Sequence, residues 1–164
     1  MGNIANSAIL TNAGNNERES AMVSVQQYWA EIGVDARSTA IEWNALLAKL
    51  TETFEFEMIV VGYGWGVDPD QKEMWHTDSH PDSFNMNQYS NERVDELLDA
   101  ALQTTDQEKR KAYYYEFQQI LAEEVPAPII YFRRTTRCWN GRLHEHDPNA
   151  IDWKWNVNRW WVDR

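Results

Sequence analysis

The sequence predicts an α/β fold, with a mixed sheet that starts as a β-α-β-α-β unit and is flanked by helices. Three observations lead to this prediction. Strand-type and helix-type segments alternate over residues 7–63, capping and stop residues stand beside the helical segments, and two more amphipathic segments follow. This order is typical of parallel strands joined by right-handed crossovers. A length of 164 residues suits one compact domain.

The first strand and the first helix have recognisable ends. Residues 7–12 form a short apolar run that leads into a turn cluster, residues 12–16. From Glu17 to Ile32 the apolar side chains recur at helical spacing. Asn16 is available as the cap of this helix, and Gly33 stands where the helix should stop.

The next three segments complete the β-α-β-α-β unit. Residues 34–41 alternate loosely between apolar and polar side chains, which predicts a strand. Residues 43–50 carry apolar side chains at helical spacing and predict a short amphipathic helix. Residues 54–63 predict a strand that becomes fully apolar where it enters a core.

Two helices are predicted after an irregular stretch from Gly64 to Tyr89. Ser90 or Asn91 caps the first of them. Residues 105–108 form a capping box, which opens a longer second helix.

The C-terminal part of the chain is harder to assign. Pro126 and Pro128 end the second helix, and residues 128–132 predict another strand of the buried type. Residues 134–164 form an Arg- and Trp-rich tail of uncertain structure, which holds five of the nine tryptophans. The chain shows no internal repeat, and we expect residues 1–164 to form a single α/β lobe.

The composition excludes several classes of function. A net charge of −11 repels phosphate backbones and anionic lipid, so nucleic acid is not an expected partner. No apolar run approaches the roughly 18–20 residues that cross a bilayer. The sequence has no Gly-x-Ser-x-Gly nucleophile motif, and its Gly-x-Gly-x-Gly run lacks the lysine of a phosphate loop. The sequence therefore lacks two common signals of enzymes, a serine nucleophile motif and a phosphate loop.

The glycine-rich loop after the third predicted strand carries the most informative pattern. It follows a buried strand, at the edge where open α/β sheets bind ligands. Gly64 and Gly66 permit close approach of the backbone to a ligand. Trp65 offers a flat apolar platform, and Asp68 a carboxylate suited to an ammonium group or a sugar hydroxyl.

The same loop also has a purely structural interpretation. Asp68 would cap a helix that has Pro69 at its first position, and Trp65 would pack under the loop. The spacing of these residues alone does not choose between the ligand site and the helix cap.

Two clusters contain residue types that bind divalent metals. His76 and His80 are four residues apart, with Asp78 and Asp82 nearby, and residues 144–147 read His-Glu-His-Asp. Neither cluster has the spacing of a metalloprotease, and both lie in loops rich in Pro or Asn. We therefore expect no metal site.

Several sequence blocks are specific when taken together, although each alone is weak. Two of them are Tyr-Ser-Asn-x-x-Val-Asp at residues 89–95 and Phe-Gln-x-Ile-Leu-x-Glu at residues 117–123. The others are residues 10–15, 32–34, 42–43, 54–65, 68–71, 75–77 and 106–110. In this order the blocks resemble the C-terminal lobe of family 5 extracellular solute-binding proteins, the oligopeptide and dipeptide receptors of ABC importers. The resemblance covers about residues 8–133.

The resemblance implies a fold and a set of partners. The chain would be a periplasmic-binding-protein-like lobe of a longer, two-lobed receptor, which closes on its ligand and delivers it to a membrane permease. No chemical step is involved, so the resemblance implies a protein that is not an enzyme and needs no cofactor. Its partners would be a peptide or other small ligand, the missing N-terminal lobe and the permease. The full-length protein would be periplasmic or extracellular, and this chain shows no export signal at its start.

The resemblance also implies a site. The Gly-Trp-x-x-Asp segment of the peptide receptors contributes to the cleft, with the Asp taking the free amino group of the peptide. These positions are Trp65 and Asp68 here, and we expect Gly64, Gly66 and Asn12 to belong to the same ligand-binding site.

Other functions remain open from the residues alone. The family includes sugar and metal-complex receptors, so an oligosaccharide receptor is one alternative. A glycosidase-like enzyme would use a carboxylate pair beside a Trp-lined cleft. A carbohydrate-binding module would explain the tryptophans by sugar stacking, but such modules are usually β-sandwiches. Tail tryptophans that face the absent lobe would also allow an isolated lobe to dimerise.

Overall fold

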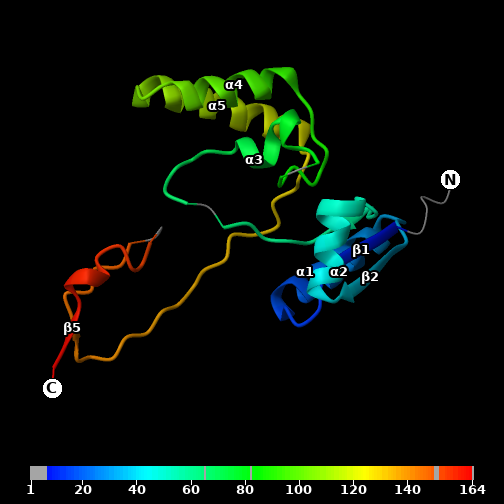
Figure 1. Ribbon diagram of the computed structural model, residues 1–164. Coiled ribbons are helices and arrows are strands. Elements are labelled where there is room, and N and C mark those ends of the chain that lie inside the picture. The colour runs from blue at the N-terminus through cyan, green and yellow to red at the C-terminus, as the bar shows by residue number, and fades with distance from the viewer. Residues whose placement is uncertain (1–6, 65, 82, 150–151, 164) are drawn as a thin grey trace. The chain divides into compact units, whose positions relative to one another are not determined.

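The computed structural model describes residues 7–64, 66–81, 83–149 and 152–163 (Figure 1). The chain divides into two compact units. Unit 1 consists of residues 1–62 and 70–128, and unit 2 consists of residues 63–69 and 129–164. The expectation of a single lobe over residues 1–164 stays a prediction.

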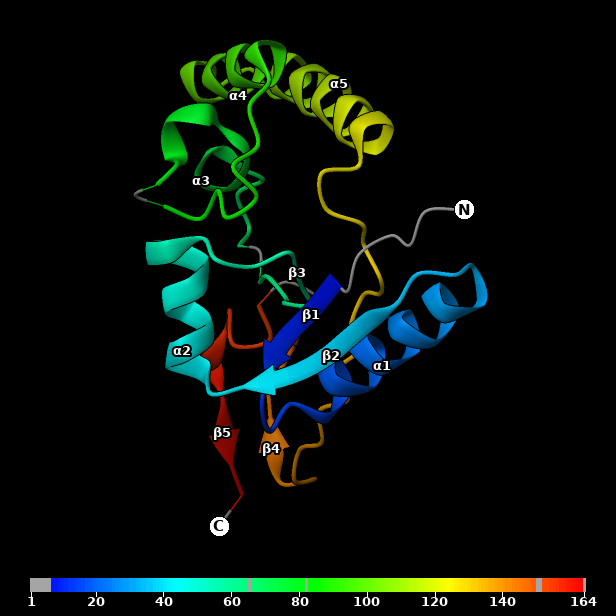
Figure 2. The same cartoon turned by 90° about the vertical axis from the view of Figure 1, so that its right-hand side faces the viewer.

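Unit 1 begins with a sheet of three parallel strands in the order β2-β1-β3 (Figure 2). The elements that build it are β1 (Ser7–Asn12), α1 (Asn16–Glu31), β2 (Ala36–Ile41), α2 (Trp43–Ala48), a π-helical turn η1 (Lys49–Thr53) and β3 (Met58–Ile59). β1 and β2 pair in parallel along their whole length. The predicted β-α-β-α-β unit is confirmed.

The two faces of this sheet bury different side chains of β1. Ile9 packs with Met22 of α1, on the face that also holds Ala36 and Val60. Leu10 points to the other face, where it packs with Leu46, Leu50 and Met86. Because successive side chains of a strand point to opposite faces, an apolar pair in β1 is covered by α1 on one side and α2 on the other.

The start of α1 differs from the prediction by one residue, whereas its end agrees. α1 is capped by Asn15, one residue before the expected Asn16, because the Asn15 side chain accepts the backbone N–H of Arg18 at 3.1 Å. Gly33 adopts φ +84°, a left-handed conformation that suits glycine and ends the helix as predicted. The cap of α2 is Glu42, whose carboxylate accepts the N–H groups of Asn44 and Ala45.

The third strand is shorter than predicted. Residues 54–63 were expected to form it, but β3 contains Met58 and Ile59 alone. The backbone N–H of Val60 still donates to Leu10, whereas its carbonyl accepts the hydroxyl of the buried Thr11 at 2.8 Å. The Thr11 hydroxyl thus takes the place of a backbone N–H as the donor to the Val60 carbonyl, and the regular pairing of β3 with β1 ends at this point.

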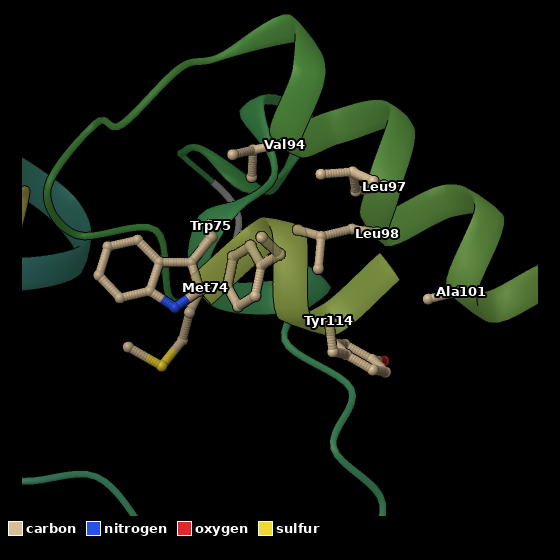
Figure 3. Close-up of a cluster of buried hydrophobic side chains, with 8 residues drawn as sticks. Met74, Trp75, Val94, Leu97, Leu98, Ala101 and Tyr114 are labelled. Atoms are coloured by element: carbon tan, nitrogen blue, oxygen red, sulfur yellow. The ribbon is translucent and has the colours of Figure 1, made fainter. Parts of the chain in front are cut away.

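The rest of unit 1 is helical, with the elements α3 (Lys72–Trp75), a 3-10 turn η2 (Thr77–Ser79), α4 (Glu92–Gln103) and α5 (Gln107–Glu124). The stretch that was expected to be irregular therefore contains two short helical pieces. Their core consists of Met74, Trp75, Val94, Leu97, Leu98, Ala101, Tyr114 and Phe117 (Figure 3). Within the described residues, every helix is too short or too polar to span a bilayer.

The ends of α4 and α5 follow the sequence signals closely. The side chain of Asn91 accepts the N–H groups of Arg93 and Val94, which confirms it as a cap. α5 is capped by Asp106 rather than Thr105. It ends at Val125, which has φ +48° and stands directly before Pro126.

Unit 2 contains little regular structure. β4 (Leu143–His144) and β5 (Trp161–Val162) pair in an antiparallel manner, and a 3-10 turn η3 (Val157–Arg159) precedes β5. The prediction of a buried strand at residues 128–132 is wrong. Residues 129–132 belong to no strand in the described part of the chain, and the side chains of Ile129, Ile130, Tyr131 and Phe132 are exposed.

Candidate ligand-binding edge of the sheet

The carboxyl end of β1 forms a fixed edge in unit 1. Asn12 is its last residue, and the next backbone N–H, that of Ala13, donates to the Ile41 carbonyl of β2 at 2.7 Å. The chain then turns at Gly14, which has φ +82° and donates its N–H to the Glu19 carboxylate at 2.7 Å. The turn between β1 and α1 is therefore held by the helix that it introduces.

Arg18 brings a positive charge to this edge. Its Nη1 donates to Oδ1 of Asn12 at 2.8 Å. A Cβ atom placed on Gly62 would lie 3.2 Å from Nη2 of Arg18, so the guanidinium lies against the backbone that follows β3. Within the described ranges, no carboxylate lies within ion-pair distance of Arg18. A cation without a carboxylate partner at this edge suits an anionic ligand group.

The glycine-rich loop lies in unit 2, with Asp68 on its exposed part. Gly64 and Gly66 are exposed, and a Cβ atom on either would meet no described atom within 4 Å. Trp65 lies outside the described residues. Desolvation raises the pKa of the Tyr63 phenol above its ordinary value, so this group stays a neutral hydrogen-bonding group at neutral pH.

The helix-cap interpretation of Asp68 is wrong. The next helix, α3, begins at Lys72, and Gln71 is its cap residue. The side chain of Asp70 accepts the N–H of Lys72 at 2.9 Å, which is the contact that had been assigned to Asp68. Pro69 lies outside the helix.

The expected site residues are thus divided between the two units. Asn12 belongs to unit 1, whereas Gly64, Gly66 and Asp68 belong to unit 2. That these residues bind one ligand together stays a prediction.

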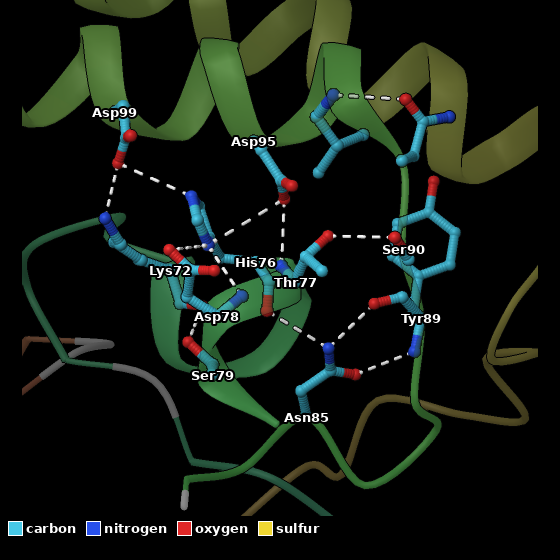
Figure 4. Close-up of polar contacts among 12 residues, drawn as sticks. Lys72, His76, Thr77, Asp78, Ser79, Asn85, Tyr89, Ser90, Asp95 and Asp99 are labelled. Carbon is cyan, nitrogen blue, oxygen red and sulfur yellow. Dashed lines mark hydrogen bonds and ion pairs between the residues drawn. The ribbon is translucent and has the colours of Figure 1, made fainter. Parts of the chain in front are cut away.

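The histidine cluster after α3 has a structural role (Figure 4). His76 is only 4% exposed, and its Nδ1 accepts the backbone N–H of Asp78 at 3.0 Å. Since Nδ1 accepts, the ring proton lies on Nε2, which faces Oδ1 of Asp99 at 3.6 Å. Asp99 also accepts a hydrogen bond from Lys72, and this bond is the main reason that the pKa of the Asp99 carboxyl is lowered.

Neighbouring polar contacts fix the chain between α3 and α4. Asp95 of α4 accepts the backbone N–H of Thr77 at 2.9 Å. The buried Asn85 donates to the carbonyls of His76 at 3.1 Å and Tyr89 at 2.8 Å, and accepts the Tyr89 N–H at 3.0 Å. These contacts hold the loop between the two helices, whereas Nε2 of His76 and Nδ1 of His80 are buried without a hydrogen-bond partner among the described residues.

The structure gives no support to either metal-binding alternative. No group of three or more potential ligands comes together in the described part of the chain. Asp82, which belongs to the first cluster, lies outside the described residues. In the second cluster His144 pairs with Asp163 at 2.8 Å and stacks on Trp161.

Sequence reasoning missed Arg18 and Asn85. Arg18 follows the cap of α1 by three residues. A basic residue is unfavourable at the positive end of the helix dipole, and this signal could have marked Arg18 as a functional residue. Asn85 lies among other asparagines in a loop, and no local pattern distinguishes the buried one.

The parallel sheet with helices on both faces defines the class of the fold. The solved oligopeptide-binding protein AppA of Bacillus subtilis, in complex with a nonapeptide, matches 97% of this chain with a TM-score of 0.76 and 23% identity. The match covers 32% of that chain. The fold is therefore that of a periplasmic-binding-protein-like lobe, as the sequence predicted.

Sequence comparison identifies individual relatives of the chain. The chain is 26% identical to AppA of Bacillus subtilis over 153 residues, which are 93% of this chain and 28% of that protein. It is 30% identical to di/tripeptide-binding protein 3 of Pseudomonas aeruginosa over 125 residues, or 74% of this chain and 23% of that protein. No family model matches the chain. These homologues are family 5 peptide-binding proteins, so the resemblance is confirmed, and the chain spans about a quarter of their length.

Proposed function

We propose that this chain is a ligand-binding lobe of a peptide receptor that serves an ABC importer. The observation that carries the proposal is its homology to a protein named for di- and tripeptide binding, at 30% identity over 125 residues. The relatives are solute-binding proteins, which supports a role without a chemical step. The oligosaccharide alternative finds no support among them.

The ligand would lie at the carboxyl edge of the sheet. Arg18 supplies a positive charge without a carboxylate partner in the described residues, which suits a peptide carboxylate. Asn12 holds the guanidinium, and its amide nitrogen adds a donor. Trp65 would supply a platform, and Asp68 would accept the free amino group.

The loop glycines are further proposed ligand contacts, in unit 2. Gly64 and Gly66 leave open space where other residues carry a Cβ atom, which would let a peptide backbone approach the loop. Backbone groups of the loop could then bond the peptide independently of its side chains.

The whole receptor would need more than this chain. We propose that the chain is the C-terminal lobe, that an N-terminal lobe supplies the rest of the cleft, and that the full protein works outside the cytoplasmic membrane with a permease. A micromolar receptor has about −8 kcal/mol of binding free energy. If one lobe provides half to two thirds of it, this chain binds a peptide with a dissociation constant near millimolar.

A ¹⁵N NMR titration tests the ligand class. Tripeptides, C-terminally amidated tripeptides and cello-oligosaccharides are added separately while the indole and arginine side-chain signals are followed. We expect shifts with the peptides at millimolar concentration and no shift with the sugars. Shifts with sugars alone would contradict the peptide assignment, and submicromolar peptide binding would contradict the half-site.

The variant Arg18→Gln, studied in the same titration, tests whether Arg18 binds the carboxylate of the peptide. It should weaken binding of the free peptide and leave binding of the amidated peptide unchanged. Lys111→Gln on α5 removes the same charge from an exposed helix position and serves as the matched control. If Arg18→Gln weakens the binding of both peptides equally, Arg18 does not bind the peptide carboxylate.

A further inference from the structure

The turn between β1 and α1 contains a glycine whose conformation is not fixed by packing within unit 1. Gly14 has φ +82°, and no described atom of unit 1 would lie within 4 Å of a Cβ atom placed on it. Glycine has more conformational freedom than any other residue, so a turn built on it needs a bond to keep one conformation. The carboxylate of Glu19 supplies such a bond, because its Oε1 accepts the Gly14 N–H at 2.7 Å.

The residues on either side of Gly14 have bonds of their own. The backbone N–H of Ala13 donates to the Ile41 carbonyl of β2 at 2.7 Å, which ties the start of the turn to the sheet. The side chain of Asn15 accepts the N–H of Arg18 at 3.1 Å, which ties the end of the turn to the helix. The bond to Gly14 therefore holds the middle of the turn.

The conformation of this turn determines where Arg18 lies. Arg18 belongs to the first turn of α1, and its guanidinium reaches back to Oδ1 of Asn12, the last residue of β1, at 2.8 Å. Residues 13–15 alone connect the strand to the helix. A change at Gly14 would move the first turn of α1 relative to the end of β1, and the guanidinium would move with it.

The charge of Glu19 also matters for Arg18. An arginine is unfavourable at the positive end of the helix dipole, and a carboxylate in the same helical turn offsets that effect. Consecutive residues of a helix point in different directions, and within the described ranges no ion pair joins Glu19 to Arg18. The guanidinium thus keeps its charge for an anionic ligand while the carboxylate is bound by the backbone.

We infer that Glu19 is a positioning residue for Arg18. Its bond to Gly14 keeps the turn in the conformation that places the guanidinium at the carboxyl edge of the sheet, and Glu19 itself makes no contact with the ligand. Through Arg18 it raises the preference of the chain for peptides with a free carboxylate over amidated peptides. The inference rests on the proposed function, in which Arg18 binds the peptide carboxylate.

The variants Glu19→Ala and Glu19→Gln separate the bond from the charge. Glutamine keeps a side-chain oxygen that can accept the Gly14 N–H, whereas alanine has no acceptor. In the chain without ligand, Glu19→Ala should speed hydrogen exchange of the Gly14 amide by at least about fivefold and shift the NMR signal of the Asn12 side-chain amide. Glu19→Gln should give smaller changes in both. Glu31→Ala, at the last residue of α1, removes the same charge far from the turn and is the matched control.

Peptide binding by the same variants tests the effect on specificity. The wild type should bind a free tripeptide about tenfold more tightly than its C-terminally amidated form, as one charge-assisted hydrogen bond provides. Glu19→Ala should reduce this preference to about threefold or less. Glu19→Gln and Glu31→Ala should keep it. Circular dichroism checks that all three variants retain the helix content of the wild type.

Two results would overturn the inference. An unchanged exchange rate of the Gly14 amide in Glu19→Ala would show that the bond does not hold the turn. A preference for the free peptide that rises in both Glu19 variants would show that the carboxylate acts only through its charge, which repels an anionic ligand.

The proposed function fails in a different way. In that case the wild type would show no preference between the two peptides, or Arg18→Gln would leave the preference intact. The exchange rate of the Gly14 amide and the signal of the Asn12 side chain need no ligand, so they still test whether Glu19 holds Arg18 in place.

Discussion

Arg18 and Asn12 join the first turn of α1 to the end of β1, because Nη1 of Arg18 donates to Oδ1 of Asn12 at 2.8 Å. The bond uses the amide oxygen of Asn12 and leaves its Nδ2 with a marginal 3.5 Å contact to the Ala13 carbonyl. A flexible arginine is thus held at the carboxyl edge of the sheet, where open α/β sheets bind their ligands.

Gly62→Ala tests whether this placement matters. The new Cβ atom would lie 3.2 Å from Nη2 of Arg18, so the guanidinium must move by a few tenths of an ångström. We expect a changed NMR signal of the Asn12 side-chain amide and peptide binding that is weaker by about threefold to tenfold. Gly141→Ala, which meets no described atom within 4 Å, is the matched control. An unchanged Asn12 signal would show that the contact is incidental.

Asn85→Ala tests the loop between α3 and α4. The buried side chain bonds the His76 carbonyl and both backbone groups of Tyr89, and its loss leaves these groups without a partner. We expect a loss of about 1–3 kcal/mol in the free energy of unfolding, measured by urea titration. Asn87→Ala removes one 3.3 Å bond at an exposed position and should cost clearly less. Equal losses would mean that burial of Asn85 has no energetic role.

Leu98→Ala tests the helical core of unit 1. Leu98 is 1% exposed and packs among the side chains shown in Figure 3, so truncation leaves a cavity. The expected loss is about 2–5 kcal/mol in the free energy of unfolding, followed by circular dichroism. Leu102→Ala, on the same helix but 45% exposed, should change the stability by about 0.5 kcal/mol or less. The reverse order would contradict the packing of α4.

Asp99→Asn tests the ion pair with Lys72 through its pH dependence. The hydrogen bond from Lys72 holds the pKa of the Asp99 carboxyl below its ordinary 3.8 in the folded protein. A lowered folded pKa stabilises the protein at pH values above 3.8, and this contribution is lost as the pH falls through the folded value. The wild type should therefore exceed Asp99→Asn in urea midpoint at pH 6 and match it near the acid limit of folding.

The control for this prediction removes a carboxylate elsewhere. Glu123→Gln, at an exposed position of α5, changes the net charge in the same way. The difference in urea midpoint between Glu123→Gln and the wild type should vary less between the two pH values than the difference for Asp99→Asn. If the urea midpoints of Asp99→Asn and the wild type differ by the same amount at all pH values, the stabilising bond between Lys72 and Asp99 is contradicted.

The fold of residues 7–41 could be predicted because its signals are local. Helix caps, Gly33 and the alternation of apolar residues depend on a few neighbouring positions, and they placed β1, α1 and β2 within two residues of their observed ends. The end of β3 could not be predicted in this way, since the Val60 carbonyl that follows it accepts the hydroxyl of Thr11, which lies 49 residues away along the chain.

The strand predicted at residues 128–132 failed for a different reason. Its composition is correct for a strand, but a strand forms only where a second backbone supplies hydrogen bonds, and no local pattern reports that partner. Arg18 was missed similarly, because its contact with Asn12 arises from the turn at Gly14 rather than from sequence spacing. Asn12, Gly64, Gly66, Trp65 and Asp68 remain predicted site residues.

The most direct test of peptide binding follows the indole signal of Trp65, assigned with the variant Trp65→Phe. A tripeptide with a free amino end is compared with its N-acetylated form, in the wild type and in Asp68→Asn. The account predicts that the signal moves with the free-amine peptide, moves less with the acetylated one, and loses this difference in Asp68→Asn. A signal that stays fixed at millimolar concentrations of both peptides, while the full-length receptor binds them normally after replacement of Trp65 and Asp68, would contradict the proposed site.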